Sequence, residues 1–147
     1  MEEKIIGTIK IKPRFYVDKE CNWFQDGKPI THKGIYVYNY RNLCKDNDLF
    51  YIREGNSKAY VYFDDKPFMI KRVNCLKDKI MILLNDFTEE KLDIESLYFS
   101  KNIPYCLVKD KKFEAKFSRA ALFQLSEEIN EKDGKFTLLN NLINIKN

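Results

Sequence analysis

Short runs of alternating apolar and polar residues, separated by turn residues, constrain the fold of this chain most strongly. The clearest run is Lys58–Phe63, which Gly55 precedes and Pro67 follows. In an extended strand its residues fall on two faces: Ala59, Val61 and Phe63 on one, and Lys58, Tyr60 and Tyr62 on the other. This pattern predicts a half-buried strand within an antiparallel meander.

Similar signals predict further strands along the whole chain. They lie at Ile5–Ile11, Phe15–Val17, Trp23–Phe24, Leu49–Arg53, Phe68–Val73, Ile80–Leu84, Tyr105–Val108, Phe113–Phe117, Phe136–Leu139 and Leu142–Ile145. Gly27 and Pro29 predict a turn after Trp23–Phe24. The stretch 85–103 is ambiguous, because it fits either one short strand or a helical turn.

Two helices are predicted between these strands. Thr31 is a candidate N-cap for a helix over residues 32–44. Ser118 is a candidate N-cap for a second helix. The apolar face of that helix consists of Ala121, Leu122, Leu125 and Ile129. The mixture of strands and helices predicts an α+β protein.

The spacing of these elements suggests an internal repeat. Thr31 lies 18 residues before the strand that begins at Leu49, and Ser118 lies 18 residues before the strand that begins at Phe136. We therefore expect duplicated strand-strand-helix-strand units with antiparallel sheets, in two closely packed halves, 1–63 and 64–147. Such a duplication creates a cleft between the copies, where ligands often bind.

Charge and hydropathy limit the function classes. The net charge of the 147 residues is +4. Residues 1–73 carry 14 basic and 10 acidic side chains, and residues 74–147 carry 12 of each. This mild excess favours an anionic ligand near the N-terminal half over duplex DNA. The chain shows neither a signal-peptide pattern nor a stretch of about 20 apolar residues. We therefore expect a cytosolic protein without a membrane partner.

Residue types that support catalysis or metal binding are scarce. His32 is the single histidine, and it fits a solvated first-turn residue of the predicted helix better than a general base. The four cysteines, Cys21, Cys44, Cys75 and Cys106, form no CxxC pair and have the apolar neighbours of buried thiols. The glycine-rich phosphate-binding motifs are missing from the sequence. We expect no enzymatic activity, no cofactor and no metal site.

Several stretches taken together resemble a bacterial family of uncharacterised proteins, domain-of-unknown-function 1285. They are Trp23-Phe24 with Gly27, Pro29 and Ile30, then Phe50-Tyr51-Ile52, Lys58–Phe68, Pro104-Tyr105 and Phe113–Arg119. The resemblance extends over roughly residues 7–145. It implies a duplicated α+β architecture whose C-terminal half is superficially similar to pleckstrin-homology-like folds. It also implies a nucleotide-like ligand between the halves and a role in signalling.

The residues and the resemblance lead to one main hypothesis for the function. We expect a non-enzymatic regulatory protein that binds a small anionic, nucleotide-like ligand between its halves. Trp23 would stack on the base, Lys28, Lys58 and Arg119 would neutralise phosphate, and Asp65 would accept a hydrogen bond from a ribose or an amino group. Ser57 stands where the family commonly has a glutamate, which puts the same ligand in question.

Two alternatives to this hypothesis stay open. The 21 aromatic residues, among them Phe15-Tyr16 and Tyr60–Phe63, could form stacking platforms for single-stranded nucleic acid. A protein–protein adaptor that uses a strand edge is the third hypothesis. The sequence does not fix the oligomeric state.

Overall fold

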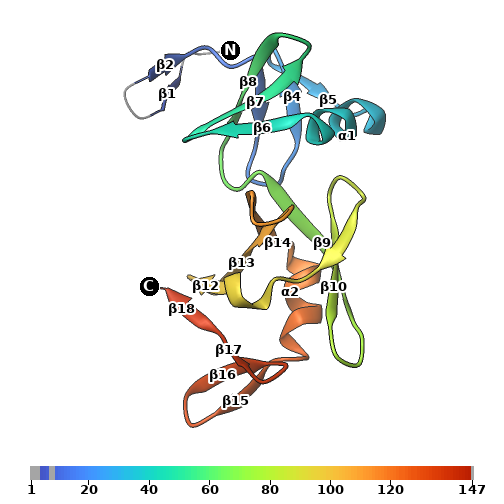
Figure 1. Ribbon diagram of the computed structural model, residues 1–147, viewed down its shortest axis with the longest axis vertical. Coiled ribbons are helices and arrows are strands. Elements are labelled where there is room, and N and C mark those ends of the chain that lie inside the picture. The colour runs from blue at the N-terminus through green and yellow to red at the C-terminus, as the bar shows by residue number, and fades with distance from the viewer. Residues whose placement is uncertain (1–3, 7–8, 147) are drawn as a thin grey trace. The chain divides into compact units, whose positions relative to one another are not determined.

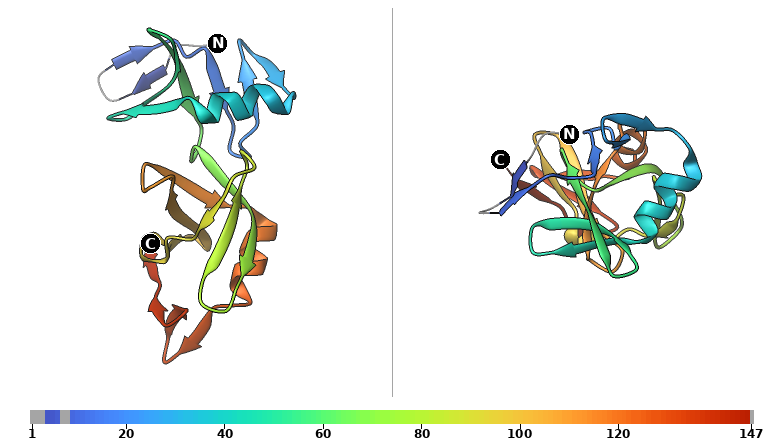
Figure 2. Two further views of the ribbon diagram at one scale, coloured as in Figure 1. Left: turned by 45° about the vertical axis from the view of Figure 1, so that its right-hand side comes forward. Right: turned by 90° about the horizontal axis from the view of Figure 1, so that it is seen from above.

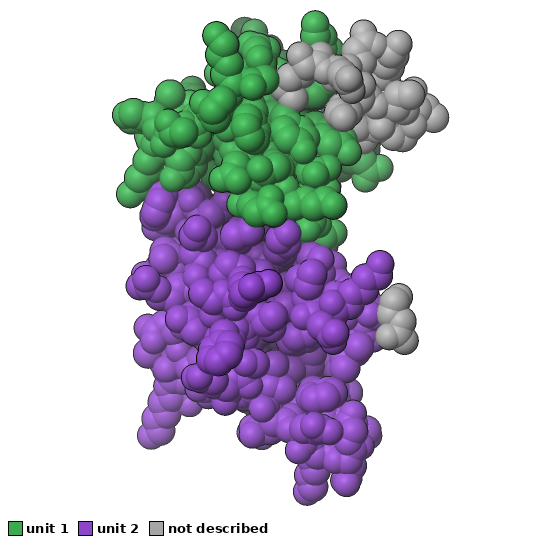
Figure 3. Space-filling view, turned by 180° about the vertical axis from the view of Figure 1, so that it is seen from behind, with its two compact units in different colours: residues 1–66 green, residues 67–147 purple. Residues whose placement is uncertain are grey.

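The computed structural model describes residues 4–6 and 9–146, with side chains from residue 11 onward. The chain forms two compact units, residues 1–66 and 67–147 (Figure 1; Figure 3). The described residues form a mostly β fold, with mixed sheets and two α-helices.

Unit 1 is built on a six-stranded sheet with the order β5-β4-β3-β8-β7-β6 (Figure 1). Its strands are β3 (Phe15–Val17), β4 (Trp23–Gln25), β5 (Lys28–Ile30), β6 (Leu43–Asp46), β7 (Leu49–Glu54) and β8 (Ser57–Phe63). The strands form two antiparallel meanders of three, joined in the middle by the parallel pair of β3 and β8. The predicted turn after β4 is confirmed, with Gly27 at a φ of +82°.

Helix α1 (Lys33–Arg41) connects the two meanders of unit 1. Its N-cap is His32, whose Nδ1 accepts a hydrogen bond from the backbone N–H of Gly34 at 3.1 Å. The predicted cap at Thr31 is therefore wrong by one residue. The helix also ends earlier than predicted, because Leu43–Asp46 pairs with β7 instead of continuing the helix. At Leu43 and Cys44 the hydrogen bonding to β7 outweighs the local preference for a helix.

Unit 2 contains a seven-stranded sheet with the order β11-β10-β9-β14-β13-β12-β18. Its strands are β9 (Phe68–Cys75), β10 (Ile80–Leu84), β11 (Glu89–Lys91), β12 (Tyr98–Ser100), β13 (Ile103–Val108), β14 (Phe113–Phe117) and β18 (Asn144–Lys146). The predicted hairpin of β13 and β14 is confirmed. The ambiguous stretch 85–103 holds both kinds of element, namely strands β11 and β12 and the 3-10 helix η1 (Ile94–Ser96).

The central parts of the two sheets have the same topology. In each, a three-stranded meander, a short helix and a second three-stranded meander follow in order, and the first and last strands pair in parallel. One backbone hydrogen bond is also equivalent in the two sheets. In each, the N–H of the residue that follows the last strand donates to a carbonyl at the matching position of the first strand. Asp64 N donates to Val17 O, and Ser118 N donates to Ile70 O, both at 2.9 Å.

In this topology helices α1 and α2 are not equivalent, although the predicted repeat treats them as copies of each other. Helix α1 lies between the meanders of unit 1, where unit 2 has η1, whereas α2 (Arg119–Ser126) follows the second meander of unit 2. The equal 18-residue steps from Thr31 and Ser118 therefore connect elements that occupy different places in the two sheets.

Helix α2 begins where the sequence predicts. Ser118 is its N-cap, and the Ser118 hydroxyl accepts a hydrogen bond from the N–H of Ala121 at 3.1 Å. Ala121 and Leu125 are fully buried, and the side chain of Gln124 accepts a hydrogen bond from Val73 N at 2.7 Å, which fixes the helix to β9.

The ends of the chain differ from the predicted strands. The run Ile5–Ile11 is two antiparallel strands, β1 (Lys4–Ile6) and β2 (Ile9–Ile11), and residues 7 and 8 lie outside the described part. After α2, strands β15 (Asn130–Lys132), β16 (Lys135–Leu138) and β17 (Asn141–Leu142) form a small separate sheet. The predicted last strand splits, and β18 returns to pair with β12 in parallel.

The predicted burial of cysteine is most complete at Cys106, which is 1% exposed on β13. Burial, with the nearby negative charges of Glu90 and Asp93, raises the pKa of this thiol far above its ordinary value. Because only the thiolate reacts, we expect Cys106 to be alkylated by iodoacetamide only after unfolding. Mass spectrometry of native and denatured protein checks this, and native labelling of Cys106 as fast as that of half-buried Cys44 would contradict it.

Candidate ligand-binding face

The two faces of the unit 1 sheet carry different groups of rings. One group, which we call the tryptophan face, consists of Phe15, Trp23, Phe50 and Phe63, and Tyr40 of α1 packs against it. Trp23 is at its centre, with edge-on contacts to Phe15, Tyr40 and Phe63 at ring-centroid distances of 5.9, 5.1 and 5.8 Å. Figure 2 shows α1 crossing this side of the sheet.

Trp23 therefore belongs to the hydrophobic core. The residue is 2% exposed, and its indole Nε1 has no hydrogen-bond acceptor among the described residues. A ring enclosed by other rings has no free face on which a base could stack. We therefore do not include Trp23 in the candidate site, although the sequence analysis placed it there.

The opposite side of the sheet, the tyrosine face, consists of Tyr16, Phe24, Tyr51, Tyr60 and Tyr62. The rings of Tyr16 and Tyr62 are stacked, with centroids 6.1 Å apart and planes 8° apart. Phe24 lies 5.8 Å from Tyr16, and Tyr60 lies 6.1 Å from Tyr51. Of the five rings only Tyr51 is fully buried; the others are half-buried. Three neighbouring strands, β4, β3 and β8, therefore present partly accessible rings in a row.

Two cations lie at one end of the tyrosine face. Lys58 and Arg53 are directly opposite each other on β8 and β7. The Nζ atom of Lys58 lies 4.7 Å from the centroid of the Tyr51 ring, and Arg53 Nη2 donates a hydrogen bond to the Tyr51 hydroxyl at 3.2 Å. Both side chains are exposed, and neither forms an ion pair with a described carboxylate. Their positive charge is thus held beside aromatic rings and open to solvent.

A carboxylate lies at the other end of the same face. Burial and the nearby negative charge of Asp64 raise the pKa of Tyr16 above its ordinary value. Asp64 follows β8 directly. The tyrosine face therefore runs from two cations, across aromatic rings, to an acceptor of hydrogen bonds.

The remaining predicted site residues do not share this face. Lys28 is exposed on the edge strand β5 and lies on the tryptophan-face side, beside an open depression of about 440 Å³ that also includes His32 and Ile35. Asp65 is half-buried beyond the end of β8. Arg119 is the exposed first residue of α2 and belongs to unit 2. Of the five predicted residues, Lys58 alone lies on the tyrosine face.

The single histidine and the potential metal ligands lie apart in the described part of the chain. His32 is exposed and serves as the cap of α1. Among the described residues no group of three or more His, Cys, Asp or Glu side chains could hold a metal ion. The helices of the described chain are also too short and too polar to cross a membrane.

Sequence reasoning missed Arg53, Tyr51 and Asp64 as members of the site. The sequence contains part of the signal for this site. Alternation along β8 places Lys58 on the same face as Tyr60 and Tyr62. The register between β7 and β8, which a single strand does not reveal, then brings Tyr51 opposite Tyr60 and Arg53 opposite Lys58.

Comparison with solved structures identifies the fold. The chain is similar to a DUF1285 family protein from Silicibacter pomeroyi DSS-3, with a TM-score of 0.77 and 18% identity over 90% of this chain and 79% of that one. It is also similar to a DUF1285 family protein from Shewanella baltica OS155, with a TM-score of 0.70 and 16% identity over 80% of this chain and 94% of that one. The fold is thus that of DUF1285 family proteins. No protein-family model and no curated protein matches the chain.

Proposed function

We propose that this chain is a non-enzymatic regulatory protein that binds a small, anionic, nucleotide-like ligand on the tyrosine face of unit 1. The observation that carries the proposal is the placement of Lys58 and Arg53 around Tyr51, on the same face as the rings of Tyr60 and Tyr62. The cations suit a phosphate, and the half-buried rings suit a base. Asp64, at the far end, is an acceptor for an amino or hydroxyl group.

The distances along β8 agree with a ligand of this kind. Tyr60 is two residues from Lys58, which is about 7 Å along an extended strand. One nucleotide can therefore contact both the lysine and the ring. The base would stack on the ring of Tyr60. The phosphate would replace solvent around Lys58 and Arg53, which form no ion pair with a described carboxylate.

Single-stranded nucleic acid is the second candidate. It is favoured by the further rings of Tyr62, Tyr16 and Phe24, which continue the row over strands β8, β3 and β4. Stacking of successive bases on such a row is tolerant of sequence and contributes about 1–3 kcal/mol per base. A mononucleotide would leave these rings unused, whereas a short oligonucleotide would cover them.

Replacement of Lys58 by alanine is expected to weaken nucleotide binding about tenfold, because one charge-assisted contact to phosphate is lost. The measurement is thermal melting of the full chain against mononucleotides, dinucleotides, cyclic nucleotides and a short single-stranded RNA. A ligand at a hundredfold excess over its Kd stabilises the folded state by about 2.7 kcal/mol.

Lys28→Ala is the matched control, since it removes the same charge from the opposite side of the sheet. Equal weakening by Lys28→Ala and Lys58→Ala would contradict the location of the site. A response to RNA alone, with a steep loss of affinity at high salt, would favour the second candidate. No response to any member of the panel would contradict both and leave a protein–protein adaptor.

We also propose that the two units derive from one duplicated motif, although in a different correspondence from the one the sequence suggests. The shared order of meander, helix and meander, and the matching bonds of Asp64 to Val17 and Ser118 to Ile70, support this. In this correspondence Phe15 matches Phe68 and Phe63 matches Phe117. The likeness of the C-terminal half to pleckstrin-homology-like folds stays a prediction.

A further inference from the structure

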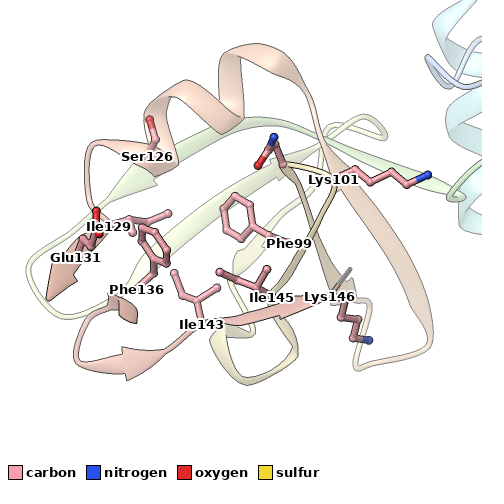
Figure 4. A pocket seen from close by; sticks show the side chains of 10 residues that line it. Phe99, Lys101, Ser126, Ile129, Glu131, Phe136, Ile143, Ile145 and Lys146 are labelled. Atoms are coloured by element: carbon pink, nitrogen blue, oxygen red, sulfur yellow. The ribbon is translucent and has the colours of Figure 1, made fainter. Parts of the chain in front are cut away.

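A second hollow, separate from the tyrosine face, lies within unit 2 between its main sheet and its small C-terminal sheet. Five apolar side chains converge on it: Phe99 of β12, Ile129 after α2, Phe136 of β16, Ile143, and Ile145 of β18 (Figure 4). Its volume is about 460 Å³. This lies within the range of about 300–1,000 Å³ that is typical of small-molecule sites.

The walls of this pocket are held by backbone pairing. Phe99 and Ile145 are direct partners in the parallel pair of β12 and β18, so both side chains project to the same side. Ile143 N donates a hydrogen bond to Phe136 O at 2.9 Å, which ties the approach to β18 to the small sheet. Ile143 is 6% exposed. Three of the five apolar lining residues, Phe99, Phe136 and Ile145, therefore come from paired strands, and Ile143 is tied to one of these strands by its backbone.

The charges around the pocket do not face into it. Lys146 is the partner of Ser100, next to Phe99, so it projects from the other side of the strand, and its Nζ lies 3.9 Å from the centroid of the Tyr98 ring. Lys101 and Lys146 both extend away from the apolar group (Figure 4). Glu131 stands at the rim beside Ile129 and would repel an anion.

We propose that this pocket binds the hydrocarbon chain of a small uncharged amphiphile. Its phenylalanine and isoleucine side chains offer apolar surface that a bound hydrocarbon chain would remove from water. The site is independent of the proposed function, because all its lining residues belong to unit 2 and it uses neither of the cations of the tyrosine face.

The test is an NMR titration of the full chain, labelled at isoleucine methyl groups, with n-alkanols from hexanol to decanol. We expect saturable shifts at Ile129, Ile143 and Ile145, with affinity rising about fourfold for each added methylene. Decanoate should bind more weakly than decanol. Shifts that grow without saturation, or tighter binding of decanoate than of decanol, would overturn the proposal.

Two exposed residues form a matched pair of variants. Ile145 is 57% exposed and lines the pocket, whereas Leu142 is 60% exposed and does not. Ile145→Lys should weaken decanol binding at least tenfold, because it puts a charge into an apolar wall. Leu142→Lys should change it less than twofold. Both substitutions are at exposed positions, so folding should be kept in each, and equal effects on binding would contradict the site.

Discussion

Replacement of Trp23 by alanine is expected to lower the free energy of unfolding by about 3–5 kcal/mol. The indole fills the centre of the tryptophan face, in contact with Phe15, Tyr40 and Phe63, so its removal takes away three ring contacts at once. Because Trp23 is the single tryptophan, unfolding of the variant is followed by circular dichroism or calorimetry instead of fluorescence.

Two further variants test this account of Trp23. Phe123→Ala removes a ring that is 70% exposed on α2, and its effect should stay within about 0.5 kcal/mol. Trp23→Phe should cost well under half as much as Trp23→Ala, because it keeps a ring and removes a buried N–H that has no described acceptor. A Trp23→Ala protein as stable as the wild type would place the indole outside the core.

Replacement of Asp86 by alanine is expected to cost about 3 kcal/mol of folding stability. Asp86 is 7% exposed and lies in the turn between β10 and β11. Its Oδ2 lies 2.8 Å from Lys109 Nζ, and its Oδ1 accepts hydrogen bonds from the hydroxyl and the N–H of Thr88 at 2.6 and 3.1 Å. The variant leaves the Lys109 ammonium without this buried carboxylate. Chemical denaturation of both proteins measures the difference.

The same pair also restrains a strained turn. Lys109, Asp110 and Lys111, between β13 and β14, all have positive φ, at 55°, 56° and 66°. Such angles are unfavourable for residues other than glycine and persist only where contacts impose them. Lys109 supplies two of these contacts, through its ammonium to Asp86 and through its backbone N–H to Glu90. Loss of Asp86 should therefore loosen the turn as well.

The pH dependence of stability follows from the pKa of Asp86. Burial by itself raises this pKa, but the hydrogen bonds from Lys109 and Thr88 and the lysine charge lower it by more, so the folded value lies below the ordinary one. The stabilisation is then fully present above the ordinary pKa of about 3.9 and is lost as the pH falls below it. The difference between wild type and Asp86→Ala should accordingly be constant above about pH 4 and should shrink as the pH falls from there through the lower pKa of the folded state.

Asp93→Ala is the control for the buried pair. Asp93 binds Lys111 of the same turn at 2.6 Å, but the lysine side chain is 63% exposed. An exposed ion pair contributes at most about 1 kcal/mol. Equal losses of folding stability in Asp86→Ala and Asp93→Ala would contradict the claim that burial makes the Asp86–Lys109 pair important for this turn.

The sequence predicts individual strands of this fold better than their assembly. Alternation identifies β8 and the hairpin of β13 and β14, because each strand has one buried face. It does not reveal that Leu43–Asp46 leaves the helix to pair with β7, since that pairing depends on a neighbour rather than on local preference. The equal 18-residue steps also do not reveal the different places of the helices. Helix α1 lies between the two meanders of unit 1, whereas α2 follows the second meander of unit 2.

The candidate site was predictable only in part, for a related reason. The sequence predicts that Lys58 shares a face with Tyr60 and Tyr62. Which face α1 covers is decided by tertiary packing. That packing places Trp23 in the core and leaves every ring of the tyrosine face except Tyr51 half-buried. Arg53 joins Lys58 through cross-strand register, which the sequence of one strand does not contain.

The most direct test of the proposed function is to follow the tyrosine ring resonances of the full chain by NMR during titration with adenosine monophosphate. The proposed face predicts saturable shifts at Tyr60 and Tyr51, with little change at the Trp23 indole. Shifts confined to the α1 side of the sheet, or no saturable shift of any tyrosine at millimolar nucleotide, would contradict it.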